Sequence, residues 1–148
     1  MTSHAGRSVP FGPLLAGTVV AGGLSALMTG LLFHWLKVTW RTDFAIPFRG
    51  PEAPLEPIPL VMVLVASAAP ALLASGMLAL LGFFLRNPLP LFALTAFLVL
   101  VFSLGAPFAL PEIADATRHG LYLLHITAGG VLTGVLCLAW VLQPEARP

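Results

Sequence analysis

Two histidines in apolar parts of the chain are the side chains best suited to chemistry. His34 lies near the end of one apolar stretch and His125 near the start of another. Each lies four residues from a glycine, Gly30 and Gly129 respectively, which predicts that each ring shares a helix face with small residues and points towards a neighbouring helix. Because ionisable groups are costly inside a membrane and tend to mark function, these histidines are the first candidates for a site.

A neutral imidazole is a good ligand for haem iron or another metal, and helical bundles hold such cofactors between facing side chains. Tyr122 lies about one turn from His125, and His119 one turn further out. The pattern therefore predicts His34 and His125 as candidate ligands of a haem or other tetrapyrrole, with Tyr122 beside them. The commoner role of membrane histidines is hydrogen bonding to other helices or to interfacial water, which needs no cofactor. Proton or quinone handling is a further alternative.

No other arrangement of residues indicates chemistry, and no catalytic residue is assigned. The chain has no Ser-His-Asp order, glycine-rich phosphate loop or HExxH sequence. No carboxylate or cysteine lies at ligand spacing from the histidines, so no metal site is predicted. The single cysteine, Cys137, excludes an internal disulfide. A net charge of +1 with scattered basic residues excludes nucleic acid as a partner.

The elements that must position the histidines are four long apolar stretches, at residues 14–36, 60–85, 91–110 and 119–142. Each reaches the ~20 residues that a helix needs to cross a bilayer. The 148 residues are 58% hydrophobic and 9% charged, with a mean hydropathy of +0.97. These values predict an all-α integral membrane protein, an up-down-up-down four-helix bundle in which residues 1–148 form one domain and the first helix is not cleaved.

The connections set the topology. Residues 38–59 form the one sizeable loop, and its five prolines after Asp43 favour an extended, hydrated connection. The short turn at Arg86 predicts that the second and third helices form an antiparallel hairpin. Four spans place both termini on one side of the membrane. The short Arg86 turn, and the acidic residues gathered in the opposite loops, favour the cytoplasmic side for the termini.

Small residues recur at a spacing of four in the first and last stretches, which predicts close helix packing. The rows are Gly22, Ala26 and Gly30 in the first stretch and Gly129 and Thr133 in the last, with Gly130 and Gly134 one row aside. Packing within the bundle is one role for these rows. An interface with a second copy or with another membrane subunit is the alternative.

Pro70 lies near the middle of the second stretch and predicts a kink there, because proline removes one helical hydrogen bond. A structural kink and a transport hinge are both consistent with this position. The sequence contains no pair of inverted repeats, which transporters often have.

The layout resembles small four-span bacterial membrane proteins grouped as the domain of unknown function DUF6069. The similarity covers roughly residues 14–142 and includes PLVMVLVASAAPALLASGMLALL in the second stretch, FSLGAP at the end of the third and LYLLHITAGGVLTGVL in the last. The most specific part is LLHITAG around His125. The resemblance implies a four-span fold and a bacterial membrane location, and it assigns no catalytic residue.

The sequence thus predicts a structural or accessory subunit of an assembly in the bacterial inner membrane. Its expected partners are the lipid bilayer and either other membrane subunits or further copies of itself. A haem-binding electron-transfer subunit that uses His34 and His125, and a small transporter or channel, are the alternatives.

Overall fold

The computed structural model describes residues 11–50, 52–110 and 113–142. Its helices are α1 (Phe11–Trp40), α2 (Leu60–Ala68), α3 (Pro70–Phe84), α4 (Leu89–Gly105), the 3-10 helix η1 (Ala106–Ala109) and α5 (Asp115–Val141). Two short strands, β1 (Ala45–Ile46) and β2 (Glu56–Pro57), pair antiparallel in the loop after α1. In these described ranges, four segments are long and apolar enough to cross a membrane: Gly12–Trp40, Leu60–Phe84, Leu89–Ala109 and Asp115–Val141. The all-α, four-span prediction is confirmed.

The second span is interrupted where the sequence predicts a kink. Helix α2 ends at Ala68 and α3 begins at Pro70, with Ala69 between them. The backbone N–H of Leu72 donates to Ala69 at 3.2 Å, a tighter turn than the regular α-helical one. Pro70 causes the break because it has no N–H to donate to the carbonyl of Ala66.

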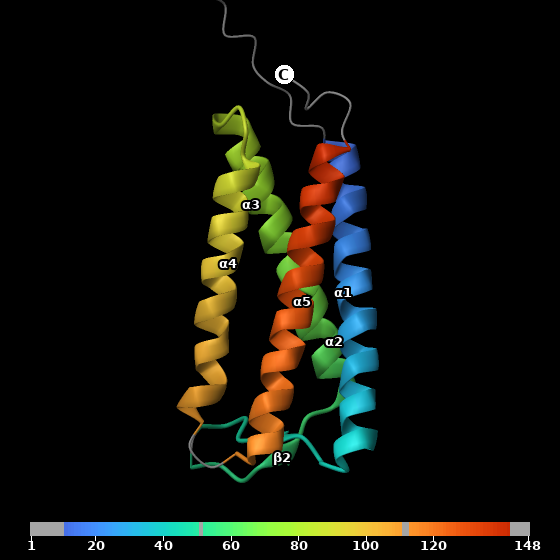
Figure 1. Ribbon diagram of the computed structural model, residues 1–148, viewed down its shortest axis with the longest axis vertical. Helices are drawn as coiled ribbons and strands as arrows, with labels where there is room; N and C mark the ends of the chain where they lie inside the picture. The colour runs from blue at the N-terminus through green and yellow to red at the C-terminus, as the bar shows by residue number, and fades with distance from the viewer. Residues whose placement is uncertain (1–10, 51, 111–112, 143–148) are drawn as a thin grey trace, which may run out of the picture.

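Helix α1 is the centre of the packing, since it contacts α5, α2 and α3. The kinked second span runs obliquely, so that α2 lies beside α1 near the long loop while α3 approaches α4 at the other end (Figure 1). Helix α4 contacts α5 and α3, and Phe92 is its only buried residue. The bundle therefore has three closely associated spans and a fourth, α4, that leaves most of its surface to lipid.

The interior has an apolar cluster at each end. The cluster towards the termini consists of Leu14, Ala21, Ala71, Leu78, Phe92, Leu132 and Leu136. The cluster towards the long loop consists of Phe33, Leu36, Phe44, Ile58, Val63 and Leu124. Between these clusters the buried face of α1 carries Ser25 and Thr29, and α2 contributes the buried Ser67. The middle of the bundle is therefore its most polar layer.

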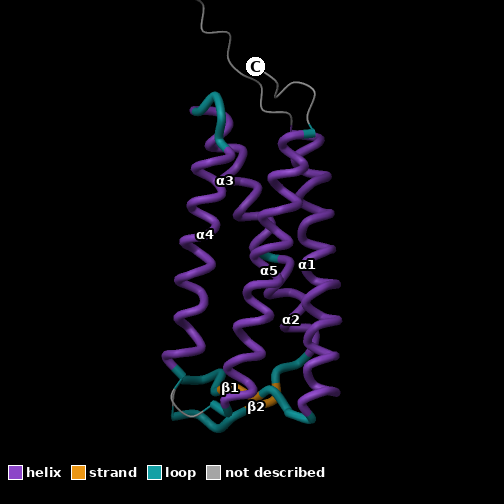
Figure 2. The backbone as a smooth tube through the Cα atoms, in the orientation of Figure 1, coloured by secondary structure: helices purple, strands orange, loops and turns teal. Residues whose placement is uncertain are grey.

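The long loop, which contains the paired strands, folds over the end of the bundle (Figure 2). Phe44 is 1% exposed, and its carbonyl accepts a hydrogen bond from the N–H of Ile58 at 2.8 Å. The ring of Phe44 packs against Phe33 and Trp40, with centroids 5.4 Å and 6.4 Å away. The expectation of an extended connection agrees with the two strands, but the connection is not hydrated throughout, because Phe44 and Ile58 are buried. We call residues 44–50 and 52–58 the cap. The prolines and charged residues of this segment indicated a hydrated loop, and they gave no sign that Phe44 and Ile58 would be buried.

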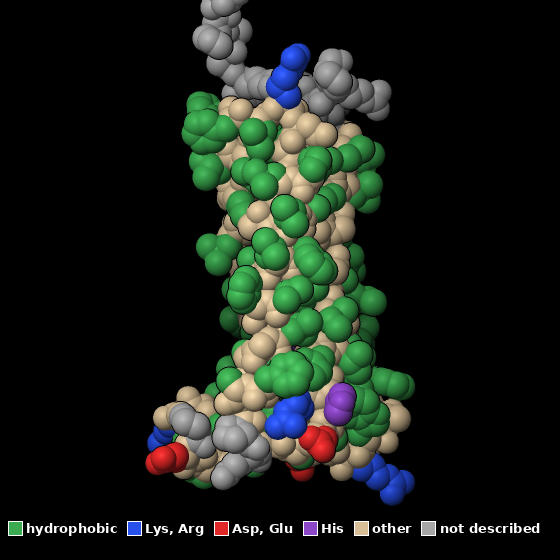
Figure 3. Space-filling model, turned by 60° about the vertical axis from the view of Figure 1, so that its left-hand side comes forward, with side chains coloured by type: hydrophobic (Ala, Val, Ile, Leu, Met, Phe, Trp, Pro, Cys, Tyr) green, Lys and Arg blue, Asp and Glu red, His purple; other side chains and the backbone are tan. Residues whose placement is uncertain are grey.

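Charged side chains gather at the two ends of the molecule, and the middle of the surface shown in Figure 3 carries none. At the loop end, Lys37 lies 3.2 Å from Asp43 and Arg118 lies 2.9 Å from Asp115. Arg118 also donates to the carbonyls of Pro107 and Leu110, which fixes the end of the third span to the start of α5. This distribution of charge is the one expected of a protein that spans a bilayer.

Candidate ligand-binding site

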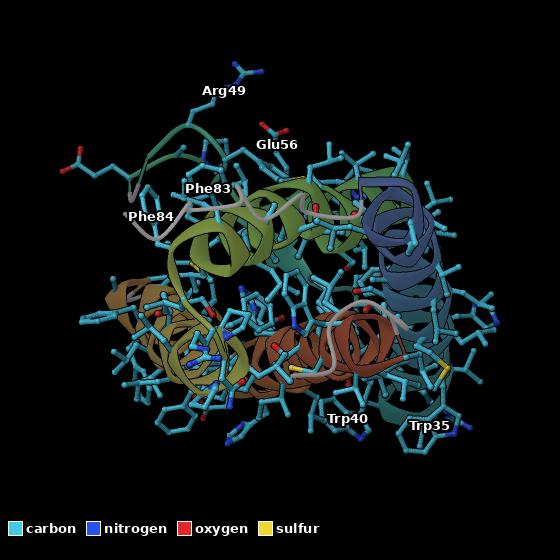
Figure 4. All side chains as sticks on the ribbon, turned by 90° about the horizontal axis from the view of Figure 1, so that it is seen from above. Trp35, Trp40, Arg49, Glu56, Phe83 and Phe84 are labelled. Carbon is cyan, nitrogen blue, oxygen red and sulfur yellow. The ribbon has the colours of Figure 1, made fainter. Side chains whose placement is uncertain are left out.

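A cavity of about 220 Å³ lies between α2 and α5, with α1 behind it and the cap at its loop end. Seen along the bundle, α2 and α3 face α5, while Arg49 and Glu56 of the cap project outwards (Figure 4). The residues that line the cavity are Thr29 of α1, Ile46 and Ile58 of the cap, Met62, Val63, Ala66 and Ser67 of α2, and Leu121, Leu124, His125 and Ala128 of α5. Most of its wall is aliphatic.

His125 is the one ionisable residue in the cavity wall. Its ring is half-buried, and Nδ1 lies 2.7 Å from the carbonyl oxygen of Leu121. A carbonyl oxygen can only accept, so Nδ1 carries the proton and donates. In the neutral imidazole Nε2 is then a bare acceptor. The helix backbone thereby fixes both the tautomer and the orientation of the ring.

Thr29 supplies a hydroxyl group whose hydrogen-bonding capacity is unused. Its side chain is 1% exposed, and Oγ1 has no hydrogen-bond partner in the described part of the chain. Thr18, on the same helix, shows the usual solution, because its hydroxyl donates to the carbonyl of Leu14 at 2.8 Å. An unpaired buried hydroxyl costs about 1–3 kcal/mol. Thr29 is therefore unsatisfied at the point where it meets the cavity.

Helix α2 contributes further acceptors. The hydroxyl of Ser67 donates to the carbonyl of Val63 at 2.7 Å, which uses its proton and leaves oxygen lone pairs. The carbonyl of Ala66 loses its helical donor to Pro70. Both residues line the cavity. The kink in the second span thus adds a polar backbone group next to the site.

The cavity opens sideways, because Met62 is 41% exposed and Ala66 is exposed as well. Val63 and Leu124, at 7% and 6%, close the opposite side. His125 lies ten residues into α5, or about 15 Å along the helix from Asp115 at a rise of about 1.5 Å per residue. The opening therefore lies at the depth of the hydrocarbon, where it faces lipid.

His34 does not share this site. It lies exposed on α1, between the buried Phe33 and Leu36, and it is not part of the cavity wall. The expectation that both histidines point into the bundle is therefore wrong for His34, while His125 does face a cavity. Their role as cofactor ligands stays a prediction.

Tyr122 lies beside the site and not in it. Its ring packs 5.1 Å from Phe108 and 6.2 Å from His119, measured between centroids. It lines a separate, shallow hollow at the surface with Trp40 and His119. Its hydroxyl oxygen is buried and has no partner within the described ranges. The structure therefore separates Tyr122 from the cavity at His125.

The predicted packing residues lie between helices to different degrees. A Cβ atom on Gly22 would contact Ala71 at 3.4 Å, one on Gly30 would meet Leu64 at 2.8 Å, and one on Gly129 would meet Leu100 at 3.1 Å. Ala26 and Thr133 are half-buried. Gly130 and Gly134 have no neighbour within 4 Å of such an atom.

Three other glycines make closer approaches, and the rows of small residues did not single them out. Gly17 faces Ala139, at 2.7 Å from an added Cβ, while Gly82 receives the indole of Trp140 and Gly120 receives the ring of Phe44. Each of these partners belongs to another element and lies far away along the sequence, and two of the three are aromatic rings. A spacing rule within one helix contains no information about such a partner.

Within the described residues, no group of three or more His, Cys, Asp or Glu side chains is placed to hold a metal ion. In the comparison with protein families, the model of a family of unknown function, DUF6069, matches residues 11–139. No curated protein and no solved structure matches the chain.

Proposed function

This chain belongs to the DUF6069 family of unknown function, and we propose that it is a membrane-embedded binding protein that takes a small amphiphilic molecule from the bilayer into the cavity at His125. It does so as an accessory component of a membrane assembly, without catalysis of its own. The ligand places its polar end against His125 and Thr29 and its apolar part against the aliphatic wall.

The observation that carries this proposal is the unpaired hydroxyl of Thr29, which lines the same cavity as His125, whose Nδ1 is held by the carbonyl of Leu121. Buried polar groups are almost always hydrogen-bonded, and of the three unpaired buried hydroxyls in the described residues, Ser25, Thr29 and Tyr122, Thr29 is the one that lines this cavity. Lipid tails cannot supply a partner for its hydroxyl. A polar ligand in the cavity would satisfy both groups at once.

The shape of the cavity favours a molecule that arrives sideways from the membrane. A volume of about 220 Å³ is below the ~300–1,000 Å³ of sites for drug-sized ligands. It exceeds the ~150 Å³ cavity that holds benzene in another protein. A ring-sized group fits, and any longer tail leaves past Met62 into lipid.

An accessory role accounts for the rest of the molecule. No catalytic arrangement accompanies the cavity in the described residues, and α4 offers a long apolar surface. Gly22, Gly30 and Gly129 face helices of their own bundle, whereas Gly130 and Gly134 on α5 have open space before them. We propose this row of α5 as the contact with another membrane subunit or a second copy, in the bacterial inner membrane.

The two alternatives fit the geometry less well. A tetrapyrrole held by His34 and His125 would need both imidazole rings to line one cavity, and that cavity would have to be larger than a site for a drug-sized ligand. The cavity at His125 is smaller, and His34 is exposed on α1. Transport would need a path through the bundle. Towards the termini, the cavity is followed by the apolar cluster that contains Leu78, Phe92 and Leu136.

The test is to fill the cavity. The change Ala128→Leu adds three carbon atoms to the cavity wall, while Ala93→Leu makes the same change at an exposed position of α4. Each protein is purified in nanodiscs of native lipid, and its bound small molecules are extracted and identified by mass spectrometry.

We expect a stoichiometric small amphiphile in the wild type and in Ala93→Leu, and its loss from Ala128→Leu. Equal recovery from all three proteins, or recovery of bulk phospholipid alone, would show that the cavity binds nothing specific.

A further inference from the structure

The hydrogen-bonding groups of the cavity are mostly acceptors. We infer from this that the ligand is a ring amphiphile with aromatic hydroxyl groups, of the phenol or hydroquinone class, and that the cavity selects it over the oxidised quinone form. This inference rests on the proposed function, because it names the ligand of the same cavity.

Three of the four polar groups can only accept, or have already used their proton. In neutral His125, Nε2 is an acceptor because Nδ1 holds the proton for Leu121. Ser67 donates its proton to Val63. The carbonyl of Ala66 has lost its donor to Pro70. The hydroxyl of Thr29 is the one free donor.

The ligand must therefore bring protons for hydrogen bonds, and it must be uncharged. The cavity wall, within the part of the chain that the structure describes, contains no Lys, Arg, Asp or Glu side chain to balance a charge. A buried charge without a partner is far more costly than a buried neutral hydroxyl. Ammonium and phosphate groups are thereby disfavoured, and a neutral hydroxyl is favoured.

An aromatic hydroxyl can pair with two of the groups that lack partners, Nε2 of His125 and the hydroxyl of Thr29. Its proton is donated to Nε2 of His125, and its oxygen accepts the proton of Thr29. The ring then lies against the aliphatic side chains of Val63, Leu121 and Leu124, which line the same cavity. A volume of about 220 Å³ exceeds the ~150 Å³ of a cavity that holds benzene, which leaves room for a few methyl groups.

The quinone form has the same ring but carries only acceptor oxygens. Placed in the cavity, one oxygen would face the lone pair of Nε2, so that both atoms lack a hydrogen bond. A site built to bind a hydroxyl discriminates strongly against an analogue that lacks it, since the buried groups of the site are left unpaired. The cavity is therefore expected to bind the reduced form more tightly.

The experiment uses the full chain in nanodiscs and three small rings of nearly equal size. These are 2,5-dimethylhydroquinone, 2,5-dimethyl-1,4-benzoquinone and 1,2,4,5-tetramethylbenzene, in which methyl groups replace the two hydroxyls. Kd is measured by ligand-observed NMR, with empty nanodiscs as the reference for partition into lipid. We expect the hydroquinone to bind at least tenfold more tightly than the other two rings. A tenfold preference raises the midpoint potential of the bound couple by about 30 mV.

Two substitutions at His125 and one at His119 test the residue assignment. His125→Leu should reduce the preference for the hydroquinone to less than twofold, and His125→Gln, which keeps an acceptor, should retain part of it. His119 makes the same Nδ1 contact, 2.7 Å from the carbonyl of Asp115, but it is exposed outside the cavity. His119→Leu should therefore leave all three Kd values unchanged.

The outcomes separate this inference from the proposed function. Equal or tighter binding of the quinone, abolished by Ala128→Leu, would overturn the ligand class and leave the binding function standing. Binding no stronger than that of empty nanodiscs for all three rings would overturn the ligand class. If no small amphiphile is recovered from the native protein either, the proposed function fails as well. Because the comparison of the three rings needs only the wild type, it holds even if His125→Leu does not fold.

Discussion

At the scale of single residues, the contrast between Thr18 and Thr29 shows how this bundle departs from simple packing. Both threonines are buried on α1, and both could donate to a carbonyl one turn earlier. Thr18 does so at 2.8 Å, while the hydroxyl of Thr29 has no partner within the described ranges. The unsatisfied group costs stability, and in the proposed function a bound ligand would pair with it.

We therefore predict that Thr29→Val stabilises the ligand-free protein and weakens binding. Valine has nearly the same shape and removes the unpaired hydroxyl, so the free energy of unfolding should rise by about 1 kcal/mol. The free energy of unfolding is measured by SDS titration of the ligand-free protein in bicelles. The Kd of 2,5-dimethylhydroquinone is measured as well, and it should increase several-fold.

The matched control is Thr18→Val, which removes the hydrogen bond from Thr18 to the carbonyl of Leu14. Its free energy of unfolding should fall by about 0.5–1 kcal/mol, and ligand binding should not change. If both valine variants lost stability equally, Thr29 would have a partner that the structure does not contain, such as an ordered water.

The sequence predicted an inward orientation for both histidines, which agrees with the structure for His125 and not for the exposed His34, and the geometry of α1 explains the difference. A row with a spacing of four residues advances by about 40° around the helix at each step, because a turn contains about 3.6 residues. From Gly22 through Ala26 and Gly30 to His34 the drift is about 120°, so a row that begins at the interface ends outside it. The buried face instead mixes steps of four with steps of three, from Thr18 to Ala21 and from Phe33 to Leu36, which return it to the interface: Leu14, Thr18, Ala21, Ser25, Thr29, Phe33 and Leu36.

At the scale of the elements, the contact between α3 and α5 depends on one glycine. The indole of Trp140 occupies the space where Gly82 would carry a Cβ. We predict that Gly82→Ala lowers the free energy of unfolding by about 1–3 kcal/mol, the usual cost of overpacking. Thermal melting in one detergent checks this value.

The control for this contact is on the same helix. Gly76 is exposed and has no neighbour within 4 Å of an added Cβ, so Gly76→Ala should stabilise the protein by up to about 1 kcal/mol through helix propensity. Shortening the partner, in the double variant Gly82→Ala with Trp140→Leu, should recover part of the loss. Equal melting temperatures for the two alanine variants would contradict the close approach.

The cap depends in the same way on Phe44, whose ring fits against Gly120 of α5. We predict that Phe44→Ala detaches the cap, since truncation of a buried phenylalanine costs about 3–5 kcal/mol. Limited proteolysis should then cleave residues 44–58 at least tenfold faster, while Phe48→Ala, at a position 37% exposed, should change the rate little. Unchanged cleavage in Phe44→Ala would mean that the cap is held elsewhere.

The spans and the kink were predictable from the sequence, because a long apolar run in a membrane has few alternatives to a helix and Pro70 cannot continue one smoothly. The cap was not predictable. Whether Phe44 or Phe48 becomes buried depends on Gly120, which lies far along the chain and meets the loop only after the bundle has formed. The cavity was not predictable either, because its wall combines Thr29, Ser67 and His125 from three helices that meet only in the folded protein.

At the scale of the whole molecule, the polar middle layer and the two apolar clusters place the cavity in one half of the membrane. Its wall reaches from the cap residues Ile46 and Ile58 to Ala128, and the cluster with Leu78 and Leu136 fills the other half. In the proposed function a ligand would therefore reach His125 from the leaflet on the side of the cap. The orientation of the chain decides which leaflet that is.

We predict that both termini lie in the cytoplasm, so that the cavity belongs to the outer leaflet. Arg86 stands in a turn of few residues, and Lys and Arg in short loops orient a membrane protein, although the cap side also carries the exposed Arg41. On the opposite side, Lys37, Arg49 and Arg118 each lie within 4 Å of a carboxylate, at 3.2, 3.8 and 2.9 Å.

A C-terminal fusion to green fluorescent protein should be fluorescent, and one to alkaline phosphatase inactive. The variant Arg49→Cys, made in a Cys137→Ser background, should react with a membrane-impermeant maleimide on intact cells. The reverse pattern would place the cap in the cytoplasm and the ligand in the inner leaflet, because the cavity and the cap are parts of the same end of the bundle.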